Sequence, residues 1–445
     1  MNLAELIDIA LQNNPTTKQT WGQARVAAAQ YGESLSSFYP DIQFTSQYTR
    51  TAGAFVTVPP TTPFLTTQAG PDVQLSYTLF DFGQRSSASL AAREALYYAD
   101  MTHNQQIQTV IQSVMDSYYM YLYQLKVLRA DEANLANAQA SLDAANQKFA
   151  LGLVALGDVA QARTQFLQSR INLTTQKQSV EDAFAQLAVD LGLPANVHFK
   201  VVPMPEEVAA DPMLDSIEQL VALAQTQRQD LLAAEANMRS KEASVLNARR
   251  AVYPVLATNL DVGQYWFQQW QTDNGHWTAE LTLSFPLFQG FYYKNQVKTA
   301  ESNLEVSKAQ FLQTELAVIQ SITTSHMNIK TSAQNLKDTE EYLKAAELEF
   351  DIALSSYKVG TATILDVLSA QSSLADARSK KANAQRSWFT ALAAIAYATG
   401  SLCLPAGDIH GEIEKSGNGQ GGCSGFSAET RHSVHEHGPK WGRKI

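Results

Sequence analysis

The sequence predicts a mixed α and β fold in which the same set of helices and strands occurs twice. Three observations predict it. Short segments of the first half recur in the second half, apolar and polar side chains alternate in four stretches, and apolar side chains recur every seventh residue in much longer stretches. At 445 residues the chain is long enough for two or three domains, since a domain averages about 150 residues.

The composition argues against nucleic-acid binding and against a disulfide-stabilised fold. The chain has 33 Lys and Arg residues against 43 Asp and Glu residues, whereas a phosphate-binding surface needs clustered basic side chains. Two cysteines, Cys403 and Cys423, are too few for a disulfide framework or a four-thiolate zinc site. No run of about 18 apolar residues occurs, so no transmembrane helix is predicted. The first residues lack the pattern of a secretory signal, so we expect either a cytosolic protein or a mature chain whose leader is gone.

The first half of the chain is repeated in the second half. Phe38-Tyr39-Pro40 returns as Val252-Tyr253-Pro254, and Leu151-Gly152 followed by Asp158-Val159 returns as Val359-Gly360 followed by Asp366-Val367. We therefore expect a first repeat over residues 1–200 and a second over residues 201–405. Residues 406–445 are rich in Gly, Ser and His, a composition that favours a disordered tail.

Each repeat is expected to contain a pair of strands, at about residues 41–80 and 255–287. Apolar side chains alternate with polar ones in both segments, which is the pattern of a sheet with one apolar and one polar face. The loops that join the strands are placed at about residues 51–71 and 265–276, which are rich in Pro, Gly, Thr and Gln. The apolar face includes Ile42, Tyr48, Trp277 and Leu281.

Each strand pair is expected to lie between a short helix, at about residues 16–38 in the first repeat, and a long one. Apolar residues recur every seventh position over about residues 83–149 and 291–357, which is typical of a coiled-coil helix of roughly 100 Å. A glycine turn then leads to return helices at about residues 158–191 and 366–399. One heptad position of the second return helix is always alanine, which allows close packing: Ala370, Ala377, Ala384, Ala391 and Ala398.

Four strands on a helical rod cannot cover their own edges or their apolar face. A closed barrel of about 12 strands, assembled from three chains, removes the edges and turns the apolar face to lipid. Ile42, Tyr48, Trp277 and Leu281 are then predicted to face lipid. The alternative is a soluble periplasmic coiled-coil scaffold or adaptor, whose strand pairs pack as a small sandwich and need no lipid-facing surface.

Four segments resemble the repeat signatures of the TolC-like outer-membrane efflux proteins. They are Phe80-Asp81-Phe82-Gly83-Gln84-Arg85, Val154-Ala155-Leu156-Gly157-Asp158-Val159, Pro286-Leu287-Phe288-Gln289-Gly290 and Tyr357-Lys358-Val359-Gly360-Thr361. The resemblance covers residues 3–405, in order and in both repeats. It implies a homotrimeric channel in which an outer-membrane β-barrel continues into a periplasmic α-barrel. It also implies passive efflux or type I secretion without a cofactor, in partnership with a membrane-fusion adaptor and an inner-membrane efflux pump or ABC transporter.

The resemblance places the entrance of the channel at the two turns between the long and the return helices. Gly152 and Gly360 suit the positive φ that commonly follows a helix C-terminus. Asp158 and Asp366 each begin a return helix, where a carboxylate can cap the helix. Threefold symmetry also places each of them in a ring of three carboxylates that attracts cations. By position Tyr357 resembles the gate tyrosine of the family, with Asp158 as its hydrogen-bond partner.

The second turn departs from the family pattern at two positions. Familiar members carry an arginine two residues after the glycine of this turn, whereas this chain has Ala362, directly after Thr361. Where a second ring of aspartates follows in the family, this chain has Ser369. We therefore expect the entrance to be held less tightly than in arginine-bearing relatives.

The remaining candidates are weak. His326 lies between apolar neighbours on a heptad position and is expected to be a packed helix residue. His432, His435 and His437 with Cys423 lie in the Gly-rich tail, whose composition favours disorder over a metal site. Tyr118 and its aromatic neighbours are expected to pack between helices. No nucleophile with its base, phosphate-cradling loop or catalytic carboxylate pair is apparent, so no enzymatic activity is predicted.

Overall fold

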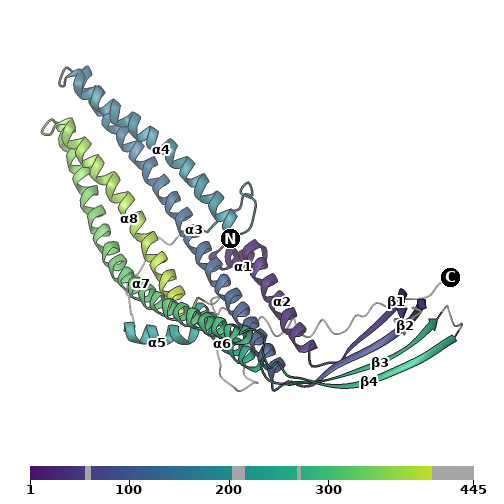
Figure 1. Cartoon of the computed structure of the whole chain (residues 1–445). Coiled ribbons are helices and arrows are strands. Elements are labelled where there is room, and N and C mark those ends of the chain that lie inside the picture. Colours follow the sequence, from purple (N-terminus) through teal and green to yellow (C-terminus); the bar gives the residue numbers. More distant parts are fainter. Residues whose placement is uncertain (56–61, 203–215, 268–271, 403–445) are drawn as a thin grey trace, which may run out of the picture. The chain divides into compact units, whose positions relative to one another are not determined.

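The computed structural model describes residues 1–55, 62–202, 216–267 and 272–402. In these residues the order helix, helix, strand, strand, helix, helix occurs twice (Figure 1). The first set comprises α1 (Leu3–Asn13), α2 (Pro15–Ser36), β1 (Asp41–Phe55), β2 (Thr62–Phe80), α3 (Gln84–Ala150) and α4 (Leu156–Asp190). The second set comprises α5 (Ile217–Gln227), α6 (Gln229–Arg250), β3 (Val255–Phe267), β4 (Thr272–Ser284), α7 (Tyr292–Val359) and α8 (Ile364–Thr399).

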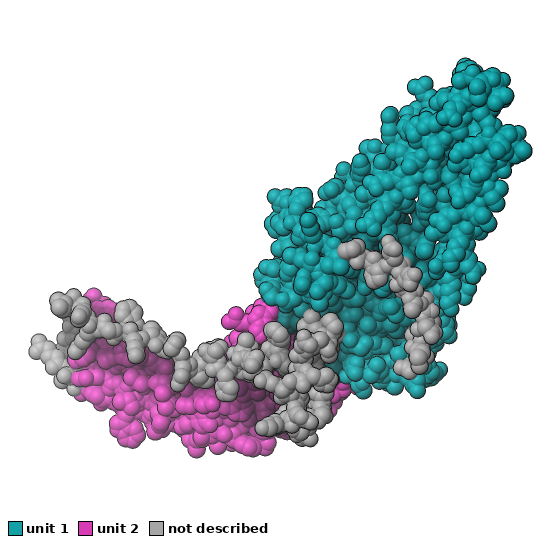
Figure 2. Space-filling view, turned by 180° about the vertical axis from the view of Figure 1, so that it is seen from behind, with its two compact units in different colours: residues 1–20, 102–232, 315–445 teal, residues 21–101, 233–314 magenta. Residues whose placement is uncertain are grey.

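The chain forms two compact units, and neither of them is a sequence repeat. One unit comprises residues 1–20, 102–232 and 315–445, and the other comprises residues 21–101 and 233–314 (Figure 2). Each unit therefore contains parts of both halves of the chain. The physical reason is the strand pairing in the second unit, residues 21–101 and 233–314. There β2 from the first half of the chain pairs with β3 from the second half.

The second unit contains a single antiparallel sheet in which the strands follow in chain order, β1-β2-β3-β4. Because directly opposed residues point to the same face, the register defines both faces. Phe44, Val73, Val262 and Trp277 form one apolar row across the sheet. The adjacent row, on the other face, consists of Thr45, Asp72, Gly263 and His276. The register also places Ile42, Tyr48 and Leu281 on the apolar face, so the four residues predicted to face lipid do share a face.

The strands are longer than predicted. The described parts of the segments expected to be loops, 51–55, 62–71, 265–267 and 272–276, are strand, and the four strands contain 15, 19, 13 and 13 residues. Thr, Gln and Gly residues continue the hairpins because backbone pairing does not depend on side-chain polarity. Pro71 lies within β2 and opposes Ser46 of β1, but no β3 residue is its ladder partner, as expected for a residue without an N–H. Pro59 and Pro60 lie outside the described residues.

The long helices α3 and α7 begin and end within two residues of the predicted bounds. The return helices α4 and α8 begin two residues earlier than predicted, so Asp158 and Asp366 lie inside their first turns. Two short helices were not predicted. Both α1 and α5 begin with a capping box, formed by Asn2 with Glu5 and by Ser216 with Gln219, and this spacing is visible in the sequence.

The first unit is held together by buried clusters between helices. One cluster joins α3, α4, α7 and α8 near the helix–helix turns and includes Ala145, Ala162, Phe350 and Val367. The alanine heptad of α8 is buried at every position, as predicted for a helix that packs closely: Ala370, Ala377, Ala384, Ala391 and Ala398. His326 is 6% exposed and Tyr119 stacks on Phe389, so both are packed helix residues as predicted.

Candidate functional site

The two turns between long and return helices have the same backbone construction. Residues 151–155 join α3 to α4, and residues 360–363 join α7 to α8 (Figure 1). Gly152 has φ +71° and Gly360 has φ +91°, as predicted for residues just beyond a helix C-terminus. In each turn the glycine N–H and the next N–H donate to carbonyls of the last helical turn, which is the Schellman pattern.

The second turn is closed by a capping box. The Asp366 carboxylate accepts hydrogen bonds of 2.8 Å from both the backbone N–H and the hydroxyl of Thr363, while the Asp366 N–H donates to that hydroxyl. These hydrogen bonds, the backbone one first, hold the pKa of Asp366 below its usual value. The side chain is exposed to solvent. An exposed carboxylate whose ionised form is favoured therefore stands at the start of α8.

The first turn lacks this box. Ala155 is the N-cap of α4 and has no side chain that can accept a hydrogen bond. Asp158 lies in the first helical turn and is partly exposed. The two aspartates thus occupy matching places but differ in role, because Asp366 is engaged in capping whereas the carboxylate of Asp158 is not.

The predicted hydrogen bond between Tyr357 and Asp158 is not formed. The Tyr357 side chain is 1% exposed, and its hydroxyl has no hydrogen-bond partner among the described residues. Its ring packs in the cluster beneath the turns, where burial first and the nearby charge of Asp158 second raise the pKa of the hydroxyl. Burial of the Tyr357 ring among the helices therefore leaves its hydroxyl without a hydrogen bond from the described residues.

A residue that sequence reasoning missed contacts Tyr357 instead. The Nζ of Lys148, in the last turn of α3, lies 4.3 Å from the centroid of the Tyr357 ring on α7. A cation over an aromatic face is attracted by roughly 0.5–2 kcal/mol, depending on its solvation. This contact connects the first helix pair to the second. Nothing in the spacing of Lys148 and Tyr357 along the chain indicates it.

The other predicted entrance residues make few polar contacts among the described residues. The hydroxyl of Thr361 donates to the carbonyl of Ser356 at 3.2 Å. Ala362 is half-buried and offers no side-chain donor, and Ser369 is exposed one helical turn after Asp366. The turns also carry exposed large apolar side chains that were not predicted: Leu151, Leu153, Leu156, Val359 and Leu365.

Two further predictions concern the C-terminal tail and transmembrane helices. The tail residues Cys423, His432, His435 and His437, like Cys403, lie outside the described residues. Among the described residues, no helix combines the length and apolar character required to cross a membrane.

The chain is similar to outer membrane proteins over most of its length. It matches the profile of the family described as outer membrane efflux protein over residues 6–193 and 220–401. It is 25% identical over 411 residues to outer membrane protein TolC of Salmonella enteritidis, covering 90% of this chain and 82% of that protein. It is also 25% identical over 407 residues to the pyoverdine export outer membrane protein OpmQ of Pseudomonas putida, covering 89% of this chain and 85% of that protein.

The fold is also found in a solved structure. The outer membrane protein VceC of Vibrio cholerae superposes on this chain with a TM-score of 0.80 at 21% identity, over 89% of this chain and 96% of that one. At this level of identity the likeness shows a shared fold.

Proposed function

Because the chain belongs to the outer membrane efflux protein family, and is therefore a passive efflux channel rather than an enzyme, we propose that it works as a homotrimer. The sheets of three copies close into one 12-stranded β-barrel in the outer membrane, since each chain contributes four strands. The helices of the three copies form an α-barrel in the periplasm.

The observation that carries this proposal is a sheet that one chain leaves incomplete. Within the described residues β1 and β4 are the outer strands, and each pairs along one side only. Ile42, Tyr48, Trp277 and Leu281 share the apolar face and are 65–77% exposed in the single chain. Pairing β4 of one copy with β1 of the next removes both edges and leaves the apolar face for lipid.

The strand lengths support a membrane-spanning role. A tilted strand needs about 9–11 residues to cross the apolar part of a bilayer. The four strands contain 15, 19, 13 and 13 residues, so each is long enough to span and to continue beyond the membrane.

The turns at residues 151–155 and 360–363 form the periplasmic entrance in this proposal. Threefold symmetry brings the Asp158 and Asp366 carboxylates of all three copies to this end of the channel, where they attract cations. The second turn has Ala362 where arginine-bearing relatives have a guanidinium, and the Tyr357 hydroxyl donates no hydrogen bond among the described residues. The closed state is therefore held mainly by packing.

The entrance is also where partners dock in this proposal. The exposed apolar side chains of the two turns, such as Leu151 and Val359, offer a surface to a periplasmic membrane-fusion adaptor. An inner-membrane efflux pump or ABC transporter then supplies the energy for export. The alternative of a soluble scaffold is not supported, because the similar proteins are outer membrane proteins.

Cysteine cross-linking tests the trimer. In a background with Cys403 and Cys423 changed to serine, Gln43→Cys on β1 and Glu280→Cys on β4 place one thiol near each edge of the sheet. A short bismaleimide added to membranes should then produce a covalent trimer. The matched control replaces the β1 thiol with Gln74→Cys on β2, which is internal to the sheet and should give no link between chains. Equal trimer yield from both pairs, or monomers from both, would contradict the proposed closure.

A further inference from the structure

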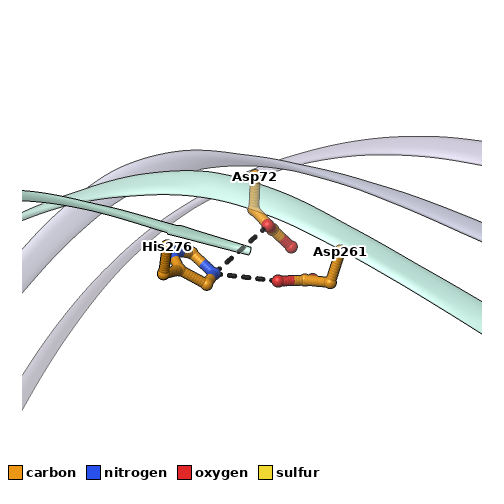
Figure 3. Close-up of side chains that lie close together, drawn as sticks. All are labelled: Asp72, Asp261 and His276. Carbon is orange, nitrogen blue, oxygen red and sulfur yellow. Dashed lines mark hydrogen bonds and ion pairs between the residues drawn. The ribbon is translucent and has the colours of Figure 1, made fainter. Parts of the chain in front are cut away.

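Three polar side chains from three neighbouring strands meet on the polar face of the sheet. Asp72 lies on β2, Asp261 on β3 and His276 on β4, and one potential ligand atom of each lies within 4.8 Å of the other two (Figure 3). The His276 Nε2 lies 2.8 Å from Asp261 Oδ1 and 3.8 Å from Asp72 Oδ1. The three side chains point toward one another, and the group is complete within one chain.

The distances suit a common ion. Two ligands that are each about 2.1 Å from one metal ion are separated by roughly 3.0–3.4 Å at octahedral or tetrahedral angles. The two measured separations, 2.8 Å and 3.8 Å, lie on either side of this range. The third separation is also below 4.8 Å, so rotation of the carboxylates can bring all three atoms toward a single centre.

The surroundings hold the ligands in place. The Tyr265 ring stacks on the His276 imidazole with centroids 4.4 Å apart and planes 10° apart, which fixes the ring while Nε2 faces the carboxylates. Gly263 lies between Asp72 and His276 in the same row of the sheet. A Cβ at this position would lie 2.6 Å from His276 Cε1 and 2.8 Å from Asp72 Oδ1, so only glycine leaves the ligands their space.

No Lys or Arg of the described strands balances the charge of the group. Two carboxylates face one imidazole, and protonation of that imidazole still leaves one negative charge. Arg50 is the only Lys or Arg in the described strands, and the register places it on the opposite face. The Asp72 Oδ1 atom is shielded from solvent and accepts no hydrogen bond from the described residues. A divalent cation supplies both the missing charge and the missing partner.

We propose that Asp72, Asp261 and His276 bind a divalent transition-metal ion on the polar face of the sheet. An imidazole ligand favours zinc and its first-row neighbours over Ca²⁺ and Mg²⁺, which prefer oxygen alone. The three side chains are 15%, 26% and 29% exposed, so water can fill the remaining positions of the ion. The ion joins β2 to β3 and β4 and so connects the two halves of the chain. This site does not depend on the proposed trimer.

Zinc binding by the full chain in detergent tests the proposal. The background carries alanine at His410, His432, His435 and His437 and serine at Cys403 and Cys423, which removes the other histidines and thiols of the C-terminal segment. Equilibrium dialysis against Zn²⁺ should give one tightly bound ion per chain. His276→Ala and Asp261→Asn should each weaken binding at least about tenfold, since even the loss of outer-shell partners has this effect.

Two glycine variants test whether zinc binding requires the geometry of the three ligands as well as their presence. Gly263→Ala keeps all three side chains but obstructs them, so zinc binding should fall as it does in His276→Ala. Gly275→Ala on β4 meets nothing within 4 Å and should bind zinc normally. His198→Ala is the control for an exposed histidine outside the sheet.

X-ray absorption at the zinc edge gives a readout that needs no variant at these positions. The background protein should show one imidazole nitrogen together with oxygen ligands. No bound zinc in the background, equal binding in the Gly263 and Gly275 variants, or a spectrum without imidazole would each overturn the proposal.

Discussion

At the second turn, Asp366 has two roles that a pair of substitutions separates. Its carboxylate caps α8 through Thr363 and, in the proposed trimer, contributes charge to the entrance. Divalent cations added on the periplasmic side should block single-channel conductance in a planar bilayer, and Asp366→Ala should relieve the block. Thr363→Ala weakens the cap but keeps the charge, so the block should persist. If both variants relieved the block, the block would depend on helix capping rather than on the charge of Asp366.

The pH dependence of the same block follows from the hydrogen bonds to Asp366. They lower its pKa, so the ionised carboxylate contributes stability above the unfolded pKa, and this contribution is lost as the pH falls through the lower folded value. The charge should therefore remain at about pH 5, above the ordinary carboxyl range. Conductance block by divalent cations should be unchanged between neutral pH and this value. A block that disappears in this interval would show that another group carries it.

We expect Tyr357 to stabilise the packed helices through its ring and not through its hydroxyl. Because its hydroxyl has no hydrogen-bond partner among the described residues, Tyr357→Phe should leave both thermal stability and conductance nearly unchanged. Tyr357→Ala should destabilise the protein by about 3–5 kcal/mol, since it opens a cavity among packed helices. Lys148→Met, which removes the cation above the ring, should raise conductance without this large loss of stability. If Tyr357→Phe raised conductance, a hydroxyl bond in the closed channel would be indicated.

At the scale of the elements, the two faces of β4 should respond differently to the same charge. Leu281 lies on the apolar face and Thr282 on the polar face. If the apolar face meets lipid, Leu281→Arg should cost about 2–4 kcal/mol near the membrane midplane. Thr282→Arg should cost much less. The measurement is the free energy of unfolding from lipid vesicles, and equal costs would show that the faces are wrongly assigned.

For the whole molecule, assembly should not require the C-terminal segment. Deleting residues 411–445 removes none of the described helices or strands and none of the heptad positions. The truncated chain should therefore still be extracted only with detergent and still form trimers. Size-exclusion chromatography with light scattering checks this, with the full chain as the control. Monomers from the truncated chain alone would show that the segment takes part in assembly.

The sequence by itself determined the long helices, the return helices and the two faces of the strands. Heptad spacing predicted the bounds of α3 and α7 to within two residues. A helix that packs along its whole length has apolar residues at a regular spacing, and this spacing is visible in the sequence. Alternation assigned Ile42 and Trp277 to one face for the same reason. The glycines at the two turns were also correctly predicted, since a positive φ favours glycine.

Only the tertiary structure decided where side chains from distant segments meet. Strand ends depend on backbone pairing with a partner, which is why residues 51–55, 62–71, 265–267 and 272–276 are strand rather than loop. The environment of Tyr357, with Lys148 above its ring, depends on how two helix pairs pack. The group of Asp72, Asp261 and His276 exists only because β2 and β3, from different repeats, pair in one register. Alternation along each strand assigns the three residues to the polar face, but which residues of β2 and β3 lie opposite each other depends on the register of their pairing.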